Sequence, residues 1–110
     1  MANTFKLKTK ANVGVTTVGI YTAPSATTTV VIGITMANTS GSGVNVGVAV
    51  SRTSDTKDDI SLLKNAPIPS GSSLEFMSGN KIVLETNDQI NVDSDTNNSV
   101  DAALTIMEIT

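Results

Sequence analysis

TVVIGITMANTSGSGVNVGVAV, residues 29–50, is the stretch that decides the fold of this chain. Two apolar runs within it have a spacing of two, namely Val30, Ile32, Ile34 and Met36, then Val44, Val46, Val48 and Val50. This spacing places the apolar side chains on one face of an extended strand. Residues 38–43, NTSGSG, lie between the runs and are of the types that tolerate turn dihedrals. The stretch therefore predicts a β-hairpin whose apolar face is turned toward a core.

The opposite face of the two strands is small and neutral. It carries Val31, Gly33, Thr35 and Ala37 on the first strand, and Asn45, Gly47, Ala49 and Ser51 on the second. A solvated sheet face usually carries longer charged side chains. Close approach of another layer, from the same chain or from a neighbouring subunit, explains the small residues. A Thr- and Ser-rich face exposed to water explains them equally well.

The rest of the chain repeats the alternation of apolar and polar residues. Further strands are predicted around Phe5 and Leu7, from Val13 to Ile20, at Leu74 and Phe76, at Ile82 and Leu84, at Ile90 and Val92, and from Val100 to Ile106. Residues 60–63 form a short strand or turn, and 56–65 has room for one helical turn. Eight or nine short strands predict an all-β fold, an antiparallel β-sandwich of the jelly-roll or immunoglobulin-like kind. We expect residues 1–12 to form an N-terminal arm or edge strand and residues 13–110 a single β-sandwich domain.

The composition excludes most kinds of catalytic site. The 110 residues include no histidine and no cysteine, which excludes a thiolate nucleophile, a disulfide framework and a cysteine-ligated zinc site. Acid–base catalysis would then depend on carboxylates such as Asp55, Asp58 and Asp59, which lie in a polar loop where solvated charges are expected. We therefore predict that the protein is not an enzyme and binds no cofactor.

The net charge of −3 argues against a nucleic-acid partner, because binding to phosphates needs a basic surface. The N-terminus lacks the apolar segment of a signal peptide, and no apolar run is long enough to span a bilayer. We therefore expect no membrane partner. The charge is unevenly distributed, since Lys6, Lys8 and Lys10 lie near the start whereas six carboxylates and no cation follow Lys81.

Residues 93–97, DSDTN, match the D-x-D-x-N opening of an EF-hand calcium loop. The match then fails, because Asn98 stands in place of glycine and Leu104 in place of the bidentate glutamate. Asn98 can still adopt the left-handed conformation that the loop needs. An Asx-rich turn between strands is the favoured interpretation, and calcium binding stays as an alternative.

The segment FKLKTK, residues 5–10, is the candidate interaction site. Its candidate docking residues are Phe5, Lys6, Leu7, Lys8 and Lys10. Lysines on an edge strand prevent unwanted strand pairing. The same arm can also dock on an acidic surface of a partner or of the next subunit.

Four phrases, in order, carry a family resemblance: YTAPSATTTVVIGITMANTSGSG from residue 21, PIPSGSSLEF from 67, NKIVLETNDQINV from 80 and MEIT from 107. From Tyr21 to Ile109 the chain resembles a recurring type of small all-β virion structural protein of tailed bacteriophages, the head decoration or cement type. Residues 25–27 depart from the Ala-Gly-Lys-like turn that is usual in these proteins.

The resemblance implies a capsid decoration or cement protein that docks on the assembled shell of a tailed phage. The implied partners are the major capsid protein and copies of the chain itself, with a homotrimer as the oligomer that local three-fold axes of a shell favour. The implied location is the virion, after synthesis in the host cytoplasm. The alternative is a neck, tail or fibre-associated β-sandwich that binds a carbohydrate or receptor. Such sites usually present aromatic platforms, and the chain has only Phe5, Tyr21 and Phe76.

Overall fold

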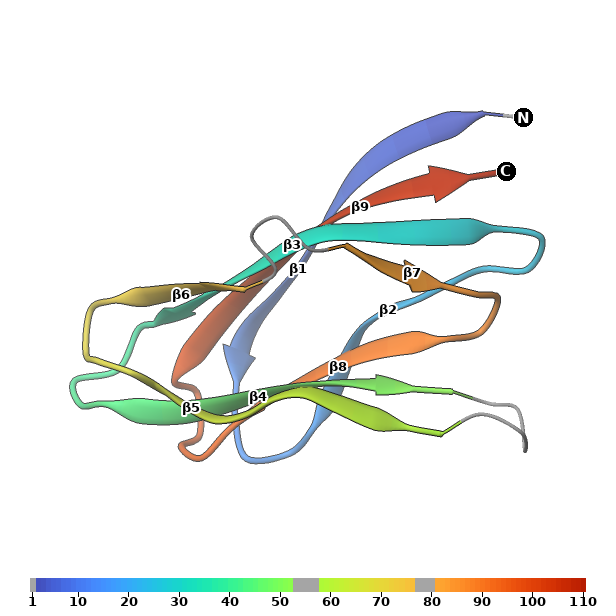
Figure 1. The fold of residues 1–110 in the computed structure, drawn as a ribbon. Helices are drawn as coiled ribbons and strands as arrows, with labels where there is room; N and C mark the ends of the chain where they lie inside the picture. Colours follow the sequence, from blue (N-terminus) through green and yellow to red (C-terminus); the bar gives the residue numbers. More distant parts are fainter. Residues whose placement is uncertain (1, 53–57, 77–80) are drawn as a thin grey trace.

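The computed structural model of the protein describes residues 2–52, 58–76 and 81–110. These residues form nine strands and no helix (Figure 1). The strands are β1 (Asn3–Val13), β2 (Val18–Thr22), β3 (Thr28–Asn38), β4 (Val44–Ser51), β5 (Ile60–Ile68), β6 (Ser73–Phe76), β7 (Ile82–Leu84), β8 (Gln89–Ser94) and β9 (Val100–Ile109). The predicted all-β class is confirmed.

The strands make two antiparallel sheets that face each other across the core (Figure 1). Sheet A has the order β1-β9-β3-β6, and β7 pairs with the other end of β3. Sheet B has the order β2-β8-β4-β5. The predicted antiparallel β-sandwich is therefore confirmed. Residues 3–13 lie at the edge of sheet A, where β1 pairs with β9 from Asn3↔Ile109 to Val13↔Val100.

The predicted hairpin of residues 29–50 is wrong, because β3 belongs to sheet A and β4 to sheet B. The connection between them is organised by the buried side chain of Asn38. Its amide nitrogen donates to the carbonyls of Ser42 (2.8 Å) and Ile68 (2.9 Å), and its oxygen accepts the backbone N–H of Ser40 (2.9 Å). An apolar alternation identifies the buried face of each strand. It does not distinguish two strands side by side from two strands that face each other across a core.

The predicted inward face of β3 is only half correct. Ile34 and Met36 are buried, but Val31 is buried where Val30 and Ile32 were expected. The register with β9 shifts between Val31 and Gly33. A β-bulge adds one residue to a strand, so the side chains on its two sides alternate out of phase. On β4, by contrast, all four valines are buried as predicted.

Strand β5 replaces the helical turn that was allowed within residues 56–65. Residues 60–68 are extended and pair with β4, whereas residues 56 and 57 lie outside the described part of the chain. Pro67 fits in this strand because β5 is the edge of sheet B, where a missing amide donor breaks no ladder.

The core between the sheets is aliphatic apart from one ring, that of Tyr21. Its buried hydrophobic residues are Val13, Tyr21, Ala23, Val31, Ile34, Met36, Val44, Val46, Val48, Val50, Ile68, Leu84, Ile90, Val92, Val100, Ala102, Leu104 and Ile106. Side chains of this kind stabilise the fold by roughly 1.5–3 kcal/mol each when fully buried. Because the core takes the inner faces of both sheets, contact with another molecule falls to the outer faces and the edges.

Candidate docking surfaces

Strand β1 distributes the five candidate docking residues over two faces. Phe5 and Leu7 point outward from sheet A, with 68 % and 64 % of their surface exposed, and Phe5 lies opposite Met107 of β9. Lys6, Lys8 and Lys10 alternate with them and lie opposite the buried side of β9. The segment therefore presents an apolar side and a basic side, which cannot dock on one flat surface together.

Lys6 belongs to a network that connects the two sheets. Its Nζ lies 2.8 Å from Oε1 of Glu108, a residue that is 6 % exposed. The hydroxyl of Tyr21 donates to Oε2 of Glu108 at 2.6 Å. Tyr21 has a single hydroxyl proton, so Thr29 donates to the Tyr21 oxygen across 2.7 Å. Each oxygen of the buried carboxylate thus has a donor, as burial of a charge requires.

The network shifts the pKa values of Glu108 and Tyr21 in opposite directions. The hydrogen bond from Lys6, followed by that from Tyr21, holds the pKa of Glu108 below its ordinary value of 4.5. Burial, with the hydrogen bond to Glu108 as the next cause, raises the pKa of Tyr21 to about 12. At neutral pH the network therefore holds an ionised glutamate, a charged lysine and a neutral tyrosine.

The sequence patterns did not predict the contacts among Lys6, Glu108 and Tyr21. The basic start and the acidic end of the chain were expected to meet charges on neighbouring molecules, but β1 pairs with β9 and Lys6 finds its counter-ion within the chain. One signal was present. The inward alternation of β9 through Leu104 and Ile106 continues to Glu108, which predicts that its side chain points into the core.

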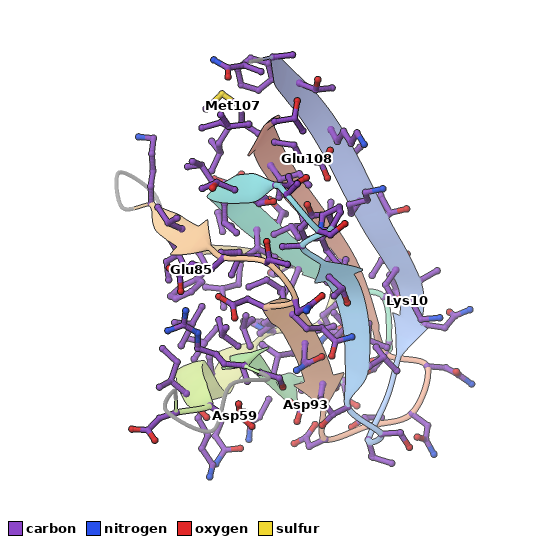
Figure 2. The ribbon with its side chains drawn as sticks, turned by 90° about the vertical axis from the view of Figure 1, so that its right-hand side faces the viewer. Lys10, Asp59, Glu85, Asp93, Met107 and Glu108 are labelled. Carbon is purple, nitrogen blue, oxygen red and sulfur yellow. The ribbon has the colours of Figure 1, made fainter. Side chains whose placement is uncertain are left out.

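Lys8 and Lys10 are the remaining cations of the segment. The Nζ of Lys8 lies 6.0 Å from the centroid of the Tyr21 ring, at the limit of a cation–π contact. Lys10 is exposed and extends away from the sandwich (Figure 2). These two side chains form the basic side of β1 that a partner can reach.

The outer face of sheet A is apolar and uncharged over most of its area. We give this name to the surface formed by Phe5, Leu7, Thr9, Ala11, Val30, Gly33, Thr35, Ala37, Val83, Ala103, Thr105 and Met107. Figure 2 shows Met107 and Glu108 on opposite sides of β9. Two carboxylates, those of Glu75 and Asp101, lie toward the β6 end of this face.

Two shallow hollows interrupt the outer face of sheet A. One, of about 360 Å³, is bordered by small residues and by two charged ones, namely Thr9, Lys10, Ala11, Thr35, Ala37, Asp101, Ala102 and Ala103. The other, of about 300 Å³, lies at the bulge of β3 and is bordered by Gly33, Thr35, Ala103 and Thr105 among others. The small side chains of β1, β3 and β9 leave this space open.

On the outer face of sheet B, contacts within the chain explain the small residue at position 47. A Cβ atom on Gly47 would lie 2.6 Å from Oδ1 of Asp93 and 3.3 Å from the carbonyl oxygen of Leu63. The glycine therefore makes room for a side chain of its own chain. Close approach of a neighbouring subunit is not needed to explain position 47.

The carboxylates of the calcium-loop candidate are engaged within the chain. Oδ2 of Asp93 accepts from the Thr17 hydroxyl (3.3 Å), and Oδ1 of Asp95 accepts the backbone N–H of Asn45 (3.1 Å). Asn98 adopts the left-handed conformation, with φ of 54°. In the part of the chain that the structure describes, no three His, Cys, Asp or Glu residues gather to hold a metal ion.

The acidic loop after β4 has a structural contact at one position. Oδ1 of Asp59 accepts the backbone N–H of Arg52 at 2.6 Å, Asp58 is exposed, and residue 55 lies outside the described residues. The guanidinium of Arg52 also binds Asp88 (3.1 Å) and Glu85 (2.5 Å), and Asp88 is the main cause of its raised pKa. These contacts tie the end of β4 to the turn before β8.

No helix within the described residues is long and apolar enough to cross a membrane. No protein-family model matches the chain, and no curated protein matches it by sequence.

Two solved structures share the fold at 12 % sequence identity. One is a protein of Bacillus endospore appendages, which form disulfide-linked pili; the match has a TM-score of 0.53 and covers 99 % of this chain and 87 % of that chain. The other comes from the T13 IBDV viral particle; the match has a TM-score of 0.56 and covers 96 % of this chain and 30 % of that chain. This chain thus spans less than a third of the viral chain. At such low identity the similarity shows the fold alone.

Proposed function

We propose that the protein is a structural, non-catalytic component of a tailed-phage virion, a decoration or cement protein that docks on the major capsid protein of the assembled head. The observation that carries the proposal is the open outer face of sheet A on a small sandwich, which is uncharged except for Glu75 and Asp101 toward its β6 end. Exposed large apolar side chains such as Phe5, Leu7 and Val83 on one face are typical of contact surfaces. The two proteins with a similar fold come from a pilus and a viral particle, which supports a role in an assembly.

We assign the main docking contact with the shell to the outer face of sheet A, and we assign to the basic side of β1, at the edge of that sheet, contacts with a part of the shell that rises beside the docked protein. Lys8 and Lys10 lie on one side of an edge strand, and Lys6 is held by Glu108. Individual surface ion pairs contribute little, so shape and apolar contacts supply most of the affinity and charge sets the orientation. A shell offers many equivalent sites side by side, which raises the retention of a weakly bound subunit.

The carbohydrate-binding alternative has little support from the positions of the rings. Tyr21 is 7 % exposed, and Phe76 packs against the core. Phe5 is the one aromatic side chain left exposed, whereas sugar sites usually combine aromatic and polar groups in a pocket.

Co-sedimentation with assembled shells tests the proposal. The shells are made from the major capsid gene nearest to this gene in the genome, and unassembled capsid protein serves as the comparison. We expect the unmodified chain to sediment with shells and to ignore a glycan array. Failure to bind the shells, or selective binding of a glycan, contradicts the proposal.

Charge reversal at two lysines tests the docking side. The double variant Lys8→Glu with Lys10→Glu keeps Lys6, because its loss would disturb Glu108 and the fold. We expect weaker shell binding, most clearly at low salt where charges are least screened. Lys64→Glu, on exposed β5 of the other sheet, is the matched control and should bind normally. Equal binding by both variants removes β1 from the docking surface.

A further inference from the structure

Residues 3–10 of β1, which we call the leading segment, are held by one neighbouring strand. They lie at the edge of sheet A and pair with β9 (Figure 1). None of their side chains is buried, whereas β3 and β9 each bury five of theirs. Besides the ladder with β9, the segment has the ion pair of Lys6 with Glu108 and the approach of Lys8 to the Tyr21 ring. The leading segment therefore adds backbone hydrogen bonds and an ion pair to the fold, but no part of the buried core.

A break in the ladder separates the leading segment from the body of the domain. The pairing of β1 with β9 shifts after Lys10 and resumes at Val13, so residues 11 and 12 form a bulge. Asn12 has a φ of 58°, which asparagine tolerates. Beyond the bulge the chain is fixed, because Val13 is 1 % exposed and its carbonyl accepts the backbone N–H of Ser99 at 3.1 Å. Rotation at residues 11 and 12 thus moves the leading segment without moving a buried side chain.

Departure of the leading segment leaves a site on β9 with defined requirements. The freed edge of β9 presents unpaired backbone N–H and C=O groups, which are a template for another strand. Glu108, 6 % exposed, loses the cation at its Oε1, and an ionised carboxylate that is buried without its counter-charge is costly. The site thus selects an extended strand with a cation at the position opposite Ile106. The leading segment of a second copy meets this requirement with Lys6.

We propose that two copies of the chain exchange their leading segments, so that residues 3–10 of each pair with β9 of the other in the register seen within one chain. Lys6 of one copy then binds Glu108 of the other, so a second molecule completes the site at Glu108. The exchanged contact costs little, because it repeats contacts that the single chain already makes. An extended segment of this length spans about 27 Å, close to the 29 Å width of the domain.

Concentration decides between the closed and the exchanged form. Within one chain the leading segment is tethered beside β9, at an effective concentration that is roughly millimolar for a short connection. Dilute protein therefore stays as closed single chains, and exchange becomes favourable when copies are crowded to a similar concentration. Binding side by side on a shell is one such condition. Exchange itself needs no shell, so it goes beyond the docking role and is tested apart from it.

A reversible lock on the leading segment tests the exchange. Leu7 and Thr105 lie directly opposite each other, both are exposed, and the chain has no cysteine. The double variant Leu7→Cys with Thr105→Cys, oxidised in dilute solution, should close a disulfide within one chain, because opposite residues of an antiparallel pair lie within disulfide range. Reduction frees the segment without any change of sequence, so the oxidised and reduced forms are matched.

Sedimentation without shells, at about millimolar concentration, then measures association. We expect the unmodified chain and the reduced double variant to reach twice the 11.3 kDa of one chain, and the oxidised variant to keep the mass of one chain. Association that persists in the oxidised form overturns the proposal, because it cannot use the leading segment. Absence of association from the unmodified chain also overturns it, even when the protein still binds shells.

Mixing two single-cysteine variants tests the register of the exchanged strands. Leu7→Cys chains and Thr105→Cys chains are combined at about millimolar concentration in a glutathione buffer that lets disulfides exchange. We expect a disulfide between the two kinds of chain, at least about tenfold more abundant than in a mixture of Leu7→Cys with Ile60→Cys. Ile60 is the matched control position, because it is 51 % exposed but lies on sheet B. Equal yields from the two mixtures overturn the proposal.

Discussion

Tyr21 and Glu108 join the two sheets inside the core. The Tyr21 hydroxyl, on β2 of sheet B, donates to Oε2 of Glu108, on β9 of sheet A, across 2.6 Å. Lys6 holds the other carboxylate oxygen, and Thr29 donates to Tyr21. A polar connection between otherwise apolar layers is tolerated because its members satisfy one another.

Tyr21→Phe removes only the hydroxyl and leaves Oε2 of Glu108 without this donor. We expect the free energy of unfolding to fall by about 1–3 kcal/mol, the usual cost of an unsatisfied buried group. Urea denaturation at neutral pH measures it. Thr22→Val, which removes an exposed hydroxyl on the same strand, is the control and should leave stability unchanged. Equal stability of both variants would show that the contact contributes nothing.

Acid should destabilise the protein through Glu108. Its pKa in the folded state lies below the ordinary 4.5, so the folded state favours the ionised form. The resulting stabilisation is present above pH 4.5 and is lost as the pH falls through the folded-state pKa. Glu108→Gln lacks this contribution, so the stability difference between it and the unmodified protein should shrink on acidification. Glu75→Gln, at an exposed carboxylate, controls for loss of one charge.

Alkali should act through Tyr21. Its pKa is raised from 10.0 to about 12 in the folded state, so its stabilising effect is present below pH 10 and is lost as the pH rises toward 12. The chain has one tyrosine, so phenolate absorbance reports this residue directly. We expect titration near 12 in the folded protein and near 10 in denaturant. Equal midpoints in the two states would contradict the buried network.

Val46→Asp should unfold the domain. Val46 is 1 % exposed, and a lone buried carboxylate costs several kcal/mol against a total stability of roughly 5–15 kcal/mol. Far-ultraviolet circular dichroism and the melting temperature measure the effect. Val15→Asp makes the same exchange at a position that is 56 % exposed, and it should fold normally. A folded Val46→Asp variant would refute the inward assignment of β4.

Calcium should be dispensable. The carboxylates of Asp93 and Asp95 already accept hydrogen bonds from Thr17 and Asn45. We expect the melting temperature to be the same with excess calcium and with a chelator. A rise of several degrees on adding calcium would show binding to the folded state and restore the calcium interpretation.

The alternation of apolar residues was sufficient to predict strands but not their partners. It located the buried face of β4 and the existence of β3 correctly. The alternation did not predict the bulge between Val31 and Gly33, because an extra residue changes which side chains face the core without any change of composition. The sheets to which β3 and β4 belong follow from the pairing of β3 with β9 and of β4 with β8, strands that are remote in sequence, and no local pattern contains this information.

The candidate site was also predicted only in part. The segment around Phe5 was singled out by its composition, and its two residue classes prove to lie on different faces of β1. The link between Lys6 and Glu108 joins residues that are remote in sequence, so it depends on the β1–β9 pairing. Pairing of distant strands is a property of the whole topology, and single-strand patterns do not encode it.

The central place of β9 in sheet A has a consequence for how the chain folds. Strand β9 lies between β1 and β3, so sheet A has no continuous ladder until residues 100–109 have left the ribosome. Within the described residues, β4 and β5 are the one pair of consecutive strands that hydrogen-bond to each other. High contact order of this kind slows folding to milliseconds or seconds. Until β9 is made, β1 and the edge of β3 that β9 will cover are unpaired and exposed to neighbouring nascent chains, and the lysines of β1 then oppose premature aggregation.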